Sequence, residues 1–221
     1  MKIVAINSSP RGTKSQTLHL VQTLSEAARQ AGAEVEIVDL CSLRVEYCIA
    51  CQFCYREGRC IHKDDFPQLF AKMLAADGLV WSSPNYFRSV SAQMKTMLDR
   101  MSDAIHCQSF MGKYACTIST SGGLACEEVT TYLAQILSSF GAWVSGSVAL
   151  SASAGPEAMQ AAEVRATKLG QDLVEAIRTR HFYPEQVAKL ASIREYFMRL
   201  VERNKDTWPH EAEVWSRLGW K

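Results

Sequence analysis

The sequence predicts an α/β protein in three layers: a doubly wound sheet of five parallel strands with helices on both faces. Two observations predict this class. Short apolar runs rich in valine and isoleucine alternate five times with longer segments whose apolar residues recur at helical spacing. The 221 residues, 48% of them hydrophobic, suffice for one such domain and a tail. For five strands we expect the order 2-1-3-4-5.

The same alternation gives the expected elements in chain order. We expect strands at residues 2–7, 34–40, 78–82, 113–119 and 142–150. We expect helices at about residues 18–28, 66–74, 91–105, 125–140 and 156–179, the second of them capped by Asp64 or Asp65. Residues 41–63 have no clean period and are predicted to form a long connection, the cysteine loop. Residues 1–182 would form the domain, and residues 183–221 a helix and tail that pack on it or on another subunit.

Charge and apolar content exclude several classes of protein. The chain carries 24 basic and 23 acidic residues, a formal net charge of +1, so nothing points to a nucleic-acid partner. No stretch approaches the roughly 18 apolar residues that span a bilayer, and the first apolar run is too short for a signal peptide. We therefore expect a cytoplasmic protein without a membrane partner. Its 8 cysteines are too sparse for a disulfide scaffold.

The loop after the first strand is a candidate phosphate site. Residues 8–17 contain five hydroxyl side chains, together with Arg11 and Gln16, directly before a helix. A helix N-terminus offers free backbone N–H groups and a partial positive charge, which favour a phosphate. The loop is neither a Walker loop nor the dinucleotide-binding glycine motif. The alternative interpretation is that its serine and threonine residues only cap the helix.

Two further loops are expected at the same edge of the sheet, because parallel strands end on the same side. Residues 83–89 carry two aromatic side chains, Tyr86 and Phe87, and residues 120–123 include two glycines that allow close approach of a ligand. Each loop alone is also compatible with an ordinary turn. Together, one phosphate loop and two loops suited to a flat polar ring describe a pocket for flavin mononucleotide (FMN).

These loops resemble those of the NAD(P)H-dependent FMN reductase group within the flavodoxin-like superfamily. The similarity lies in Ser8-Ser9-Pro10-Arg11, Ser15-Gln16-Thr17 and Ser83-Pro84-Asn85-Tyr86-Phe87, and it covers about residues 1–150. Serine at position 8 departs from the usual glycine, and the loop is one residue longer than the commonest form. The resemblance implies non-covalent FMN, with the phosphate near Ser9, Arg11, Ser15, Gln16 and Thr17, and the ring near Pro84, Asn85, Tyr86, Phe87, Thr120, Ser121, Gly122 and Gly123.

Four cysteines are spaced as metal ligands in the order Cys48-x2-Cys51-x2-Cys54-x5-Cys60. Compact runs of this kind present sulfur ligands to iron–sulfur clusters. From spacing alone, a zinc ion or free thiols remain alternatives. The other cysteines, Cys41, Cys107, Cys116 and Cys126, are expected in the core.

The cysteine loop resembles that of the iron–sulfur flavoproteins, a branch of the same group, although Ala50 replaces the usual glycine before the second cysteine. The resemblance implies one [4Fe–4S] cluster beside FMN, with NAD(P)H or ferredoxin as electron donor, a small-molecule acceptor and a homodimer or homotetramer. The chemistry would be carried by the flavin, without a catalytic side chain. The alternatives are an electron carrier without turnover, which the net charge disfavours, or a redox sensor based on thiols or zinc.

Two other groups have structural interpretations. Asp99 and Arg100 are predicted to form an ion pair that fixes the helix at residues 91–105. Trp208, Trp215 and Trp220 are expected to pack within the chain or at a subunit contact.

Overall fold

The computed structural model, which describes residues 1–219, contains a sheet of five parallel strands in the order β2-β1-β3-β4-β5. The predicted fold class and strand order are therefore confirmed. The strands are β1 (Lys2–Asn7), β2 (Glu34–Asp39), β3 (Gly78–Pro84), β4 (Tyr114–Ser121) and β5 (Trp143–Ser151). β3 and β4 each extend two residues further than the sequence predicts, toward the edge that carries the candidate site.

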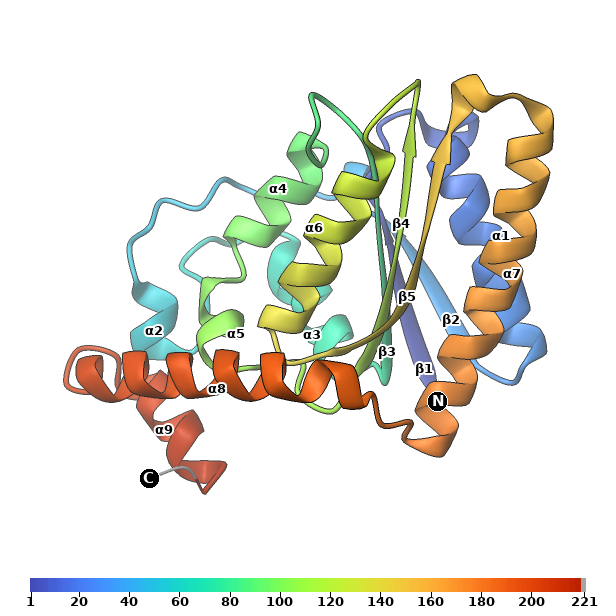
Figure 1. Ribbon diagram of the computed structural model, residues 1–221. Coiled ribbons are helices and arrows are strands. Elements are labelled where there is room, and N and C mark those ends of the chain that lie inside the picture. The colour runs from blue at the N-terminus through green and yellow to red at the C-terminus, as the bar shows by residue number, and fades with distance from the viewer. Residues whose placement is uncertain (220–221) are drawn as a thin grey trace.

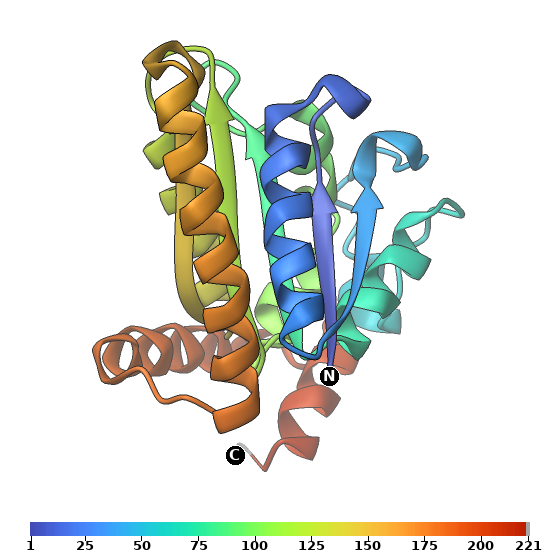
Figure 2. The ribbon, with the colours of Figure 1, turned by 90° about the vertical axis from the view of Figure 1, so that its right-hand side faces the viewer.

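Helices cover both faces of the sheet (Figures 1 and 2). One face packs against α1 (Gln16–Gln30) and α7 (Pro156–Thr179). The other packs against α3 (Phe66–Ala75), α4 (Ala92–Asp99), α5 (Ser102–His106) and α6 (Cys126–Ser139). Because successive strand residues point to opposite faces, Ile3 joins the first core and Val4 joins the second.

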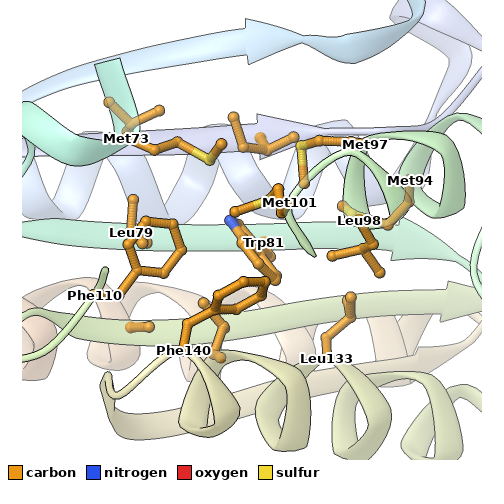
Figure 3. Packing of buried hydrophobic residues seen from close by; sticks show 14 of the residues in the cluster. Met73, Leu79, Trp81, Met94, Met97, Leu98, Met101, Phe110, Leu133 and Phe140 are labelled. Atoms are coloured by element: carbon orange, nitrogen blue, oxygen red, sulfur yellow. The ribbon is translucent and has the colours of Figure 1, made fainter. Parts of the chain in front are cut away.

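Trp81 on β3 lies at the centre of the second core (Figure 3). Its ring meets Phe110 and Phe140 edge-on, with centroids 6.1 and 5.9 Å away. Such edge-to-face pairs are favourable beyond the area that they bury. This core fixes α4 and α6, the helices that follow the two predicted ring loops.

The structure differs from the sequence-based expectation in three segments. The helix expected at 91–105 is broken into α4 and α5, because Arg100 at the break turns inward to an ion pair. The cysteine loop contains a 3-10 turn, η2 (Leu40–Ser42), and a short helix, α2 (Phe53–Glu57). The expected tail is two helices, α8 (Pro184–Asn204) and α9 (Pro209–Arg217).

The tail crosses the end of the sheet where the strands begin. α8 runs along that end, and α9 then turns to lie beside α2 (Figure 1). The predicted boundary at residue 182 falls in the loop between α7 and α8; the division into domain and tail stays a prediction. Among the described residues, no helix is both long and apolar enough to cross a membrane.

Gly170 gives a test of the packing between α1 and α7. A Cβ atom at this position would lie 2.4 Å from the backbone oxygen of Leu24. Alanine favours a helix over glycine by about 1 kcal/mol, but overpacking against backbone typically costs about 1–3 kcal/mol. We therefore expect Gly170→Ala to lower the free energy of unfolding by up to about 2 kcal/mol in urea denaturation. Gln171→Ala, at the exposed neighbouring position, should leave it nearly unchanged. A stabilised Gly170→Ala variant would contradict the close approach.

Candidate functional site

The loop after β1 is anchored at its root by Ser8. The backbone N–H and the hydroxyl of Ser8 both donate to the carbonyl oxygen of Ser82, at 3.2 and 2.9 Å. The hydroxyl of Ser91 in turn donates to the carbonyl oxygen of Ser8 at 2.9 Å. All three residues are fully buried. The serine that departs from the family's glycine therefore joins β1 to β3 and to the start of α4.

The far end of this loop is the N-terminus of α1. The Ser15 hydroxyl accepts a hydrogen bond from the Leu18 amide at 3.0 Å, so one predicted hydroxyl does cap the helix. Thr17 Oγ1 lies 2.6 Å from Thr120 Oγ1, a buried contact that ties the loop to the end of β4. Arg11 and Gln16 are exposed. The loop is thus held at both ends, with the side chains of Arg11 and Gln16 at the surface.

The loop after β3 is joined to the loop after β4 through Asn85. Its backbone N–H donates to the carbonyl oxygen of Thr120 and its side-chain amide to that of Leu124, both at 2.8 Å. The segment from Tyr86 to Ser89 forms a tight turn, in which Phe87 and Arg88 both have positive φ. The Phe87 side chain in this turn is fully exposed at the carboxyl edge of the sheet.

Several buried polar atoms at this edge lack hydrogen-bond partners, among them Asn85 Oδ1 and Ser121 Oγ. Buried polar atoms are normally satisfied, so these atoms mark a place where a polar ligand fits. Next to them, a Cβ added at Gly122 or Gly123 would meet no atom within 4 Å. The three predicted loops therefore meet at one edge, with free hydrogen-bonding capacity and open space.

A fourth loop contributes to this edge and was missed by the sequence interpretation. The segment between β5 and α7 forms a hollow of about 310 Å³ with Gln16, lined also by Gly155 and Met159. The hydroxyl of Ser151 donates to the carbonyl oxygen of Gly123. Gly155 before Pro156 was the available signal, because this pair commonly opens a helix at a strand end.

The cysteine loop brings its four predicted ligands into one hollow. Cys48, Cys51, Cys54 and Cys60 all line it, together with Arg100 and other residues around the break between α4 and α5. No three of these four sulfur atoms all lie within 4.8 Å of one another. Cys48 and Cys51 are exposed, whereas Cys54 and Cys60 are half-buried.

The backbone of this loop is shaped around sulfur. Ala50 has a φ of 51°, in the left-handed region, and its N–H points to Cys48 Sγ at 3.5 Å. This conformation explains why glycine suits the position, since a Cβ there is strained. Burial, reinforced by the negative charges of Asp103 and Cys60, raises the pKa of the Cys54 thiol to about 12. A bound cation would reverse that preference and hold the sulfur as a thiolate.

A buried ion pair closes both ends of the cysteine loop. Arg100 contacts Asp64 at 2.6 and 3.2 Å, and both side chains are fully buried. Arg100 also donates to the carbonyl oxygen of Glu46, whose N–H donates to Asp64, both at 2.8 Å. Burial favours the neutral acid, but the hydrogen bonds from Arg100 and Glu46 outweigh it and lower the pKa of Asp64.

The predicted pair of Asp99 with Arg100 is wrong. Asp99 instead pairs with Lys95 on the exposed side of α4, because consecutive residues at the end of a helix point in different directions. Cys107, Cys116 and Cys126 are buried as expected, but Cys41 is only half-buried.

The tail packs on the cysteine loop through aromatic side chains. Tyr55 on α2 contacts the rings of His106 and Trp208, each with centroids 4.8 Å apart. The indole N–H of the buried Trp215 donates to the carbonyl oxygen of His106 at 3.1 Å. Two of the three predicted tryptophans thus pack within the chain, and Trp220 lies outside the described residues.

Comparison with known proteins gives the family. A model described as NADPH-dependent FMN reductase matches residues 1–157, and the chain belongs to this family. A protein named iron-sulfur flavoprotein from Archaeoglobus fulgidus is 28% identical over 224 residues, which cover 99% of each chain. The iron-sulfur flavoprotein MJ1083 of Methanocaldococcus jannaschii is 40% identical over 100 residues, which cover 45% of this chain and 51% of the relative.

Solved structures show the same flavodoxin-like fold. A flavone reductase superposes with a TM-score of 0.64 at 21% identity, covering 80% of this chain and 63% of that chain. An archaeal flavodoxin superposes with a TM-score of 0.55 at 13% identity, covering 80% of this chain and 99% of that chain. At these identities the likeness concerns the fold.

The buried pair at the base of the cysteine loop can be tested by removing its negative charge. Asp64→Asn would leave Arg100 as an unpaired buried charge, and we expect a loss of about 3–5 kcal/mol in the free energy of unfolding. Asp99→Asn breaks the exposed pair on the same helix and should cost less than about 1 kcal/mol. Urea unfolding followed by tryptophan fluorescence measures both. Equal effects of the two substitutions would contradict a structural role for the buried pair.

Proposed function

We propose that the protein is an FMN-dependent oxidoreductase that transfers electrons between a [4Fe–4S] cluster in the cysteine loop and FMN at the carboxyl edge of the sheet. NAD(P)H or ferredoxin would be the donor, and a small molecule the acceptor. The observation that carries the proposal is the convergence of Cys48, Cys51, Cys54 and Cys60 on one hollow, in a chain of an FMN reductase family.

The residues at the carboxyl edge fit FMN. Backbone N–H groups at the start of α1, with Ser9, Ser15 and Thr17, would hold the phosphate, and Arg11 and Gln16 would close over it from the surface. Asn85 and Ser121 would use their unpaired atoms on the polar edge of the ring. Pro84, Tyr86, Phe87 and Thr120, with Gly122 and Gly123, would frame the ring.

When bound, FMN supplies both one- and two-electron redox chemistry, and the protein supplies binding, orientation and electrostatics. Thr17 and Asn85 each bridge two loops at this edge, so a ligand would meet fixed polar groups. Fixed donors near the ring tune its potential without reorganising.

The cysteine loop fits a cluster better than a single zinc ion. Four sulfurs bound to one zinc lie about 3.8 Å apart, because each Zn–S bond is about 2.3 Å. The wider spread of these sulfurs suits a cluster of several iron atoms. The Ala50 amide directed at Cys48 provides the kind of N–H contact to sulfur that tunes cluster potentials. The names of the relatives agree with this assignment.

The two candidate sites lie apart in one chain. The cysteine loop descends from β2 to α2, near the end where the strands begin, whereas the FMN loops lie at the opposite end (Figure 1). Both sites carry exposed apolar side chains: Tyr47 and Ile49 at the cysteine loop, and Phe87 and Leu124 at the FMN edge. Such patches suit a protein interface. We therefore propose a homodimer or homotetramer in which the cluster of one subunit faces the FMN of another.

The alternative functions predict different measurements. An electron carrier without turnover would oxidise NAD(P)H, with a quinone as acceptor, no faster than free FMN does. A thiol-based sensor needs a thiol with a lowered pKa. Burial instead raises the pKa of Cys41 to about 11 and that of Cys54 to about 12, which does not favour a sensor at these positions.

Anaerobic purification followed by iron and sulfide analysis tests the cluster directly. We expect about four iron atoms per chain, and FMN absorbance in about a 1:1 ratio. Cys54→Ala should abolish iron binding but retain FMN, because the two sites are built from different loops. Cys41→Ala removes a nearby thiol outside the motif and should retain both. Iron-free wild-type protein, prepared without oxygen, would refute the cluster.

Arg11 tests the phosphate site. If its guanidinium pairs with the phosphate, Arg11→Ala should weaken FMN binding by about 1.5–3 kcal/mol, or about 10- to 150-fold. Quenching of flavin fluorescence at fixed ionic strength measures the dissociation constant. Lys14→Ala removes a neighbouring exposed cation from the same loop and should have a much smaller effect. Unchanged affinity in Arg11→Ala would place the phosphate elsewhere.

A further inference from the structure

A second group of metal-ligating side chains lies beyond the cysteine loop, between α5 and α9. Asp103 on α5 and Cys107, which ends that helix, lie one turn apart, and His210 comes from the start of α9. The Asp103 carboxylate lies 3.8 Å from Cys107 Sγ and 3.7 Å from His210 Nε2. One ligand atom from each residue lies within 4.8 Å of the other two.

The Asp103 carboxylate is poorly satisfied by its neighbours. Its side chain is only 16% exposed, yet the thiol and the imidazole both lie further away than the 2.7–2.9 Å of a charged hydrogen bond. A carboxylate this deeply buried needs a cation or a proton close to it.

The surroundings of this group favour a cation. Glu211 is fully buried and contacts His106 at 3.0 Å, so a second carboxylate lies in the same cluster. A divalent ion would compensate these charges and hold Cys107 as a thiolate, with the thiol proton released to solvent.

We propose that Asp103, Cys107 and His210 bind a zinc ion at a site distinct from the four-cysteine loop. Zinc takes imidazole, thiolate and carboxylate ligands at about 2.0–2.3 Å, which places oxygen about 3.3–3.6 Å from nitrogen or sulfur. The separations of 3.7 and 3.8 Å from the Asp103 carboxylate lie within a few tenths of an ångström of that range. Three protein ligands leave one tetrahedral position for water.

This ion would join the tail to the cysteine loop. The His210 ring is packed against Gly58, where an added Cβ atom would lie 2.5 Å from the ring. Gly58 ends α2, between Cys54 and Cys60, so a zinc ion that fixes His210 also fixes the segment between two candidate cluster ligands. A zinc ion there would hold α9 against α5 beside the cysteine loop.

Zinc content of the full-length protein, purified with its iron and FMN, tests the proposal. After equilibrium dialysis against chelator-buffered zinc, the wild type should hold about one zinc ion per chain without loss of iron. Cys107→Ala should bind zinc at least about 10-fold more weakly, as should Asp103→Asn, which nearly preserves side-chain shape. Cys116→Ala removes an equally buried thiol from β4 and should bind zinc like the wild type.

X-ray absorption at the zinc edge identifies the ligands. We expect one sulfur at about 2.3 Å together with nitrogen and oxygen ligands at about 2.0 Å. Four sulfur ligands would place the zinc in the cysteine loop and overturn the proposal. Equal zinc binding by the wild type and both variants would also overturn it, and so would a wild type without zinc. The two proposals can fail separately. Iron-free protein would refute the proposed electron transfer, whereas the zinc content and the zinc ligands are measured whether or not iron is present.

Discussion

All five strands run parallel, and the position of the candidate flavin site depends on this one constraint. A parallel connection must travel back along the sheet before the next strand begins, so every turn from a strand into a helix leaves from the same edge. Residues far apart in sequence therefore meet, as Thr17 meets Thr120 at 2.6 Å. Both faces of the sheet are buried under helices, so polar groups concentrate at the strand ends. The orphaned atoms of Asn85 and Ser121 follow from that placement.

The cysteine loop also leaves the sheet at this edge. It then descends along the outside of the domain, so parallel topology does not determine its shape. Its shape depends instead on the buried pair of Asp64 and Arg100, which also holds both polar backbone groups of Glu46. Such a pair, desolvated on both sides, contributes more to a defined geometry than to net stability. The two candidate sites therefore rest on different elements of one domain, and the proposed oligomer would bring them together.

The sequence predicted the strands well because apolar runs bounded by turn residues are a strong local signal. It also grouped the four cysteines and the three loops predicted to hold FMN, since ligand spacing and parallel topology are both visible in the chain. It failed where long-range contacts decide. Arg100 breaks the helix expected at 91–105 because it turns inward to Asp64, 36 residues earlier. The spacing of apolar residues cannot predict such a distant ion pair. The five-residue helix α2 was missed because it is too short to show a period, and it depends on packing against α9.

The tail was the least predictable segment and has the clearest structural consequence. An amphipathic pattern shows that a helix has a buried face, but not what covers it. In the structure, α8 crosses the end where the strands begin, and Trp208 and His210 at the start of α9 lie against the cysteine loop. Glu211 on the same helix contacts His106 on α5. The family match ends at residue 157, before both helices, whereas the match to the Archaeoglobus iron-sulfur flavoprotein spans 99% of the chain. α9 thus lies outside the family match and packs against α2 in the cysteine loop, so its contacts are with the candidate metal site rather than with the candidate flavin edge.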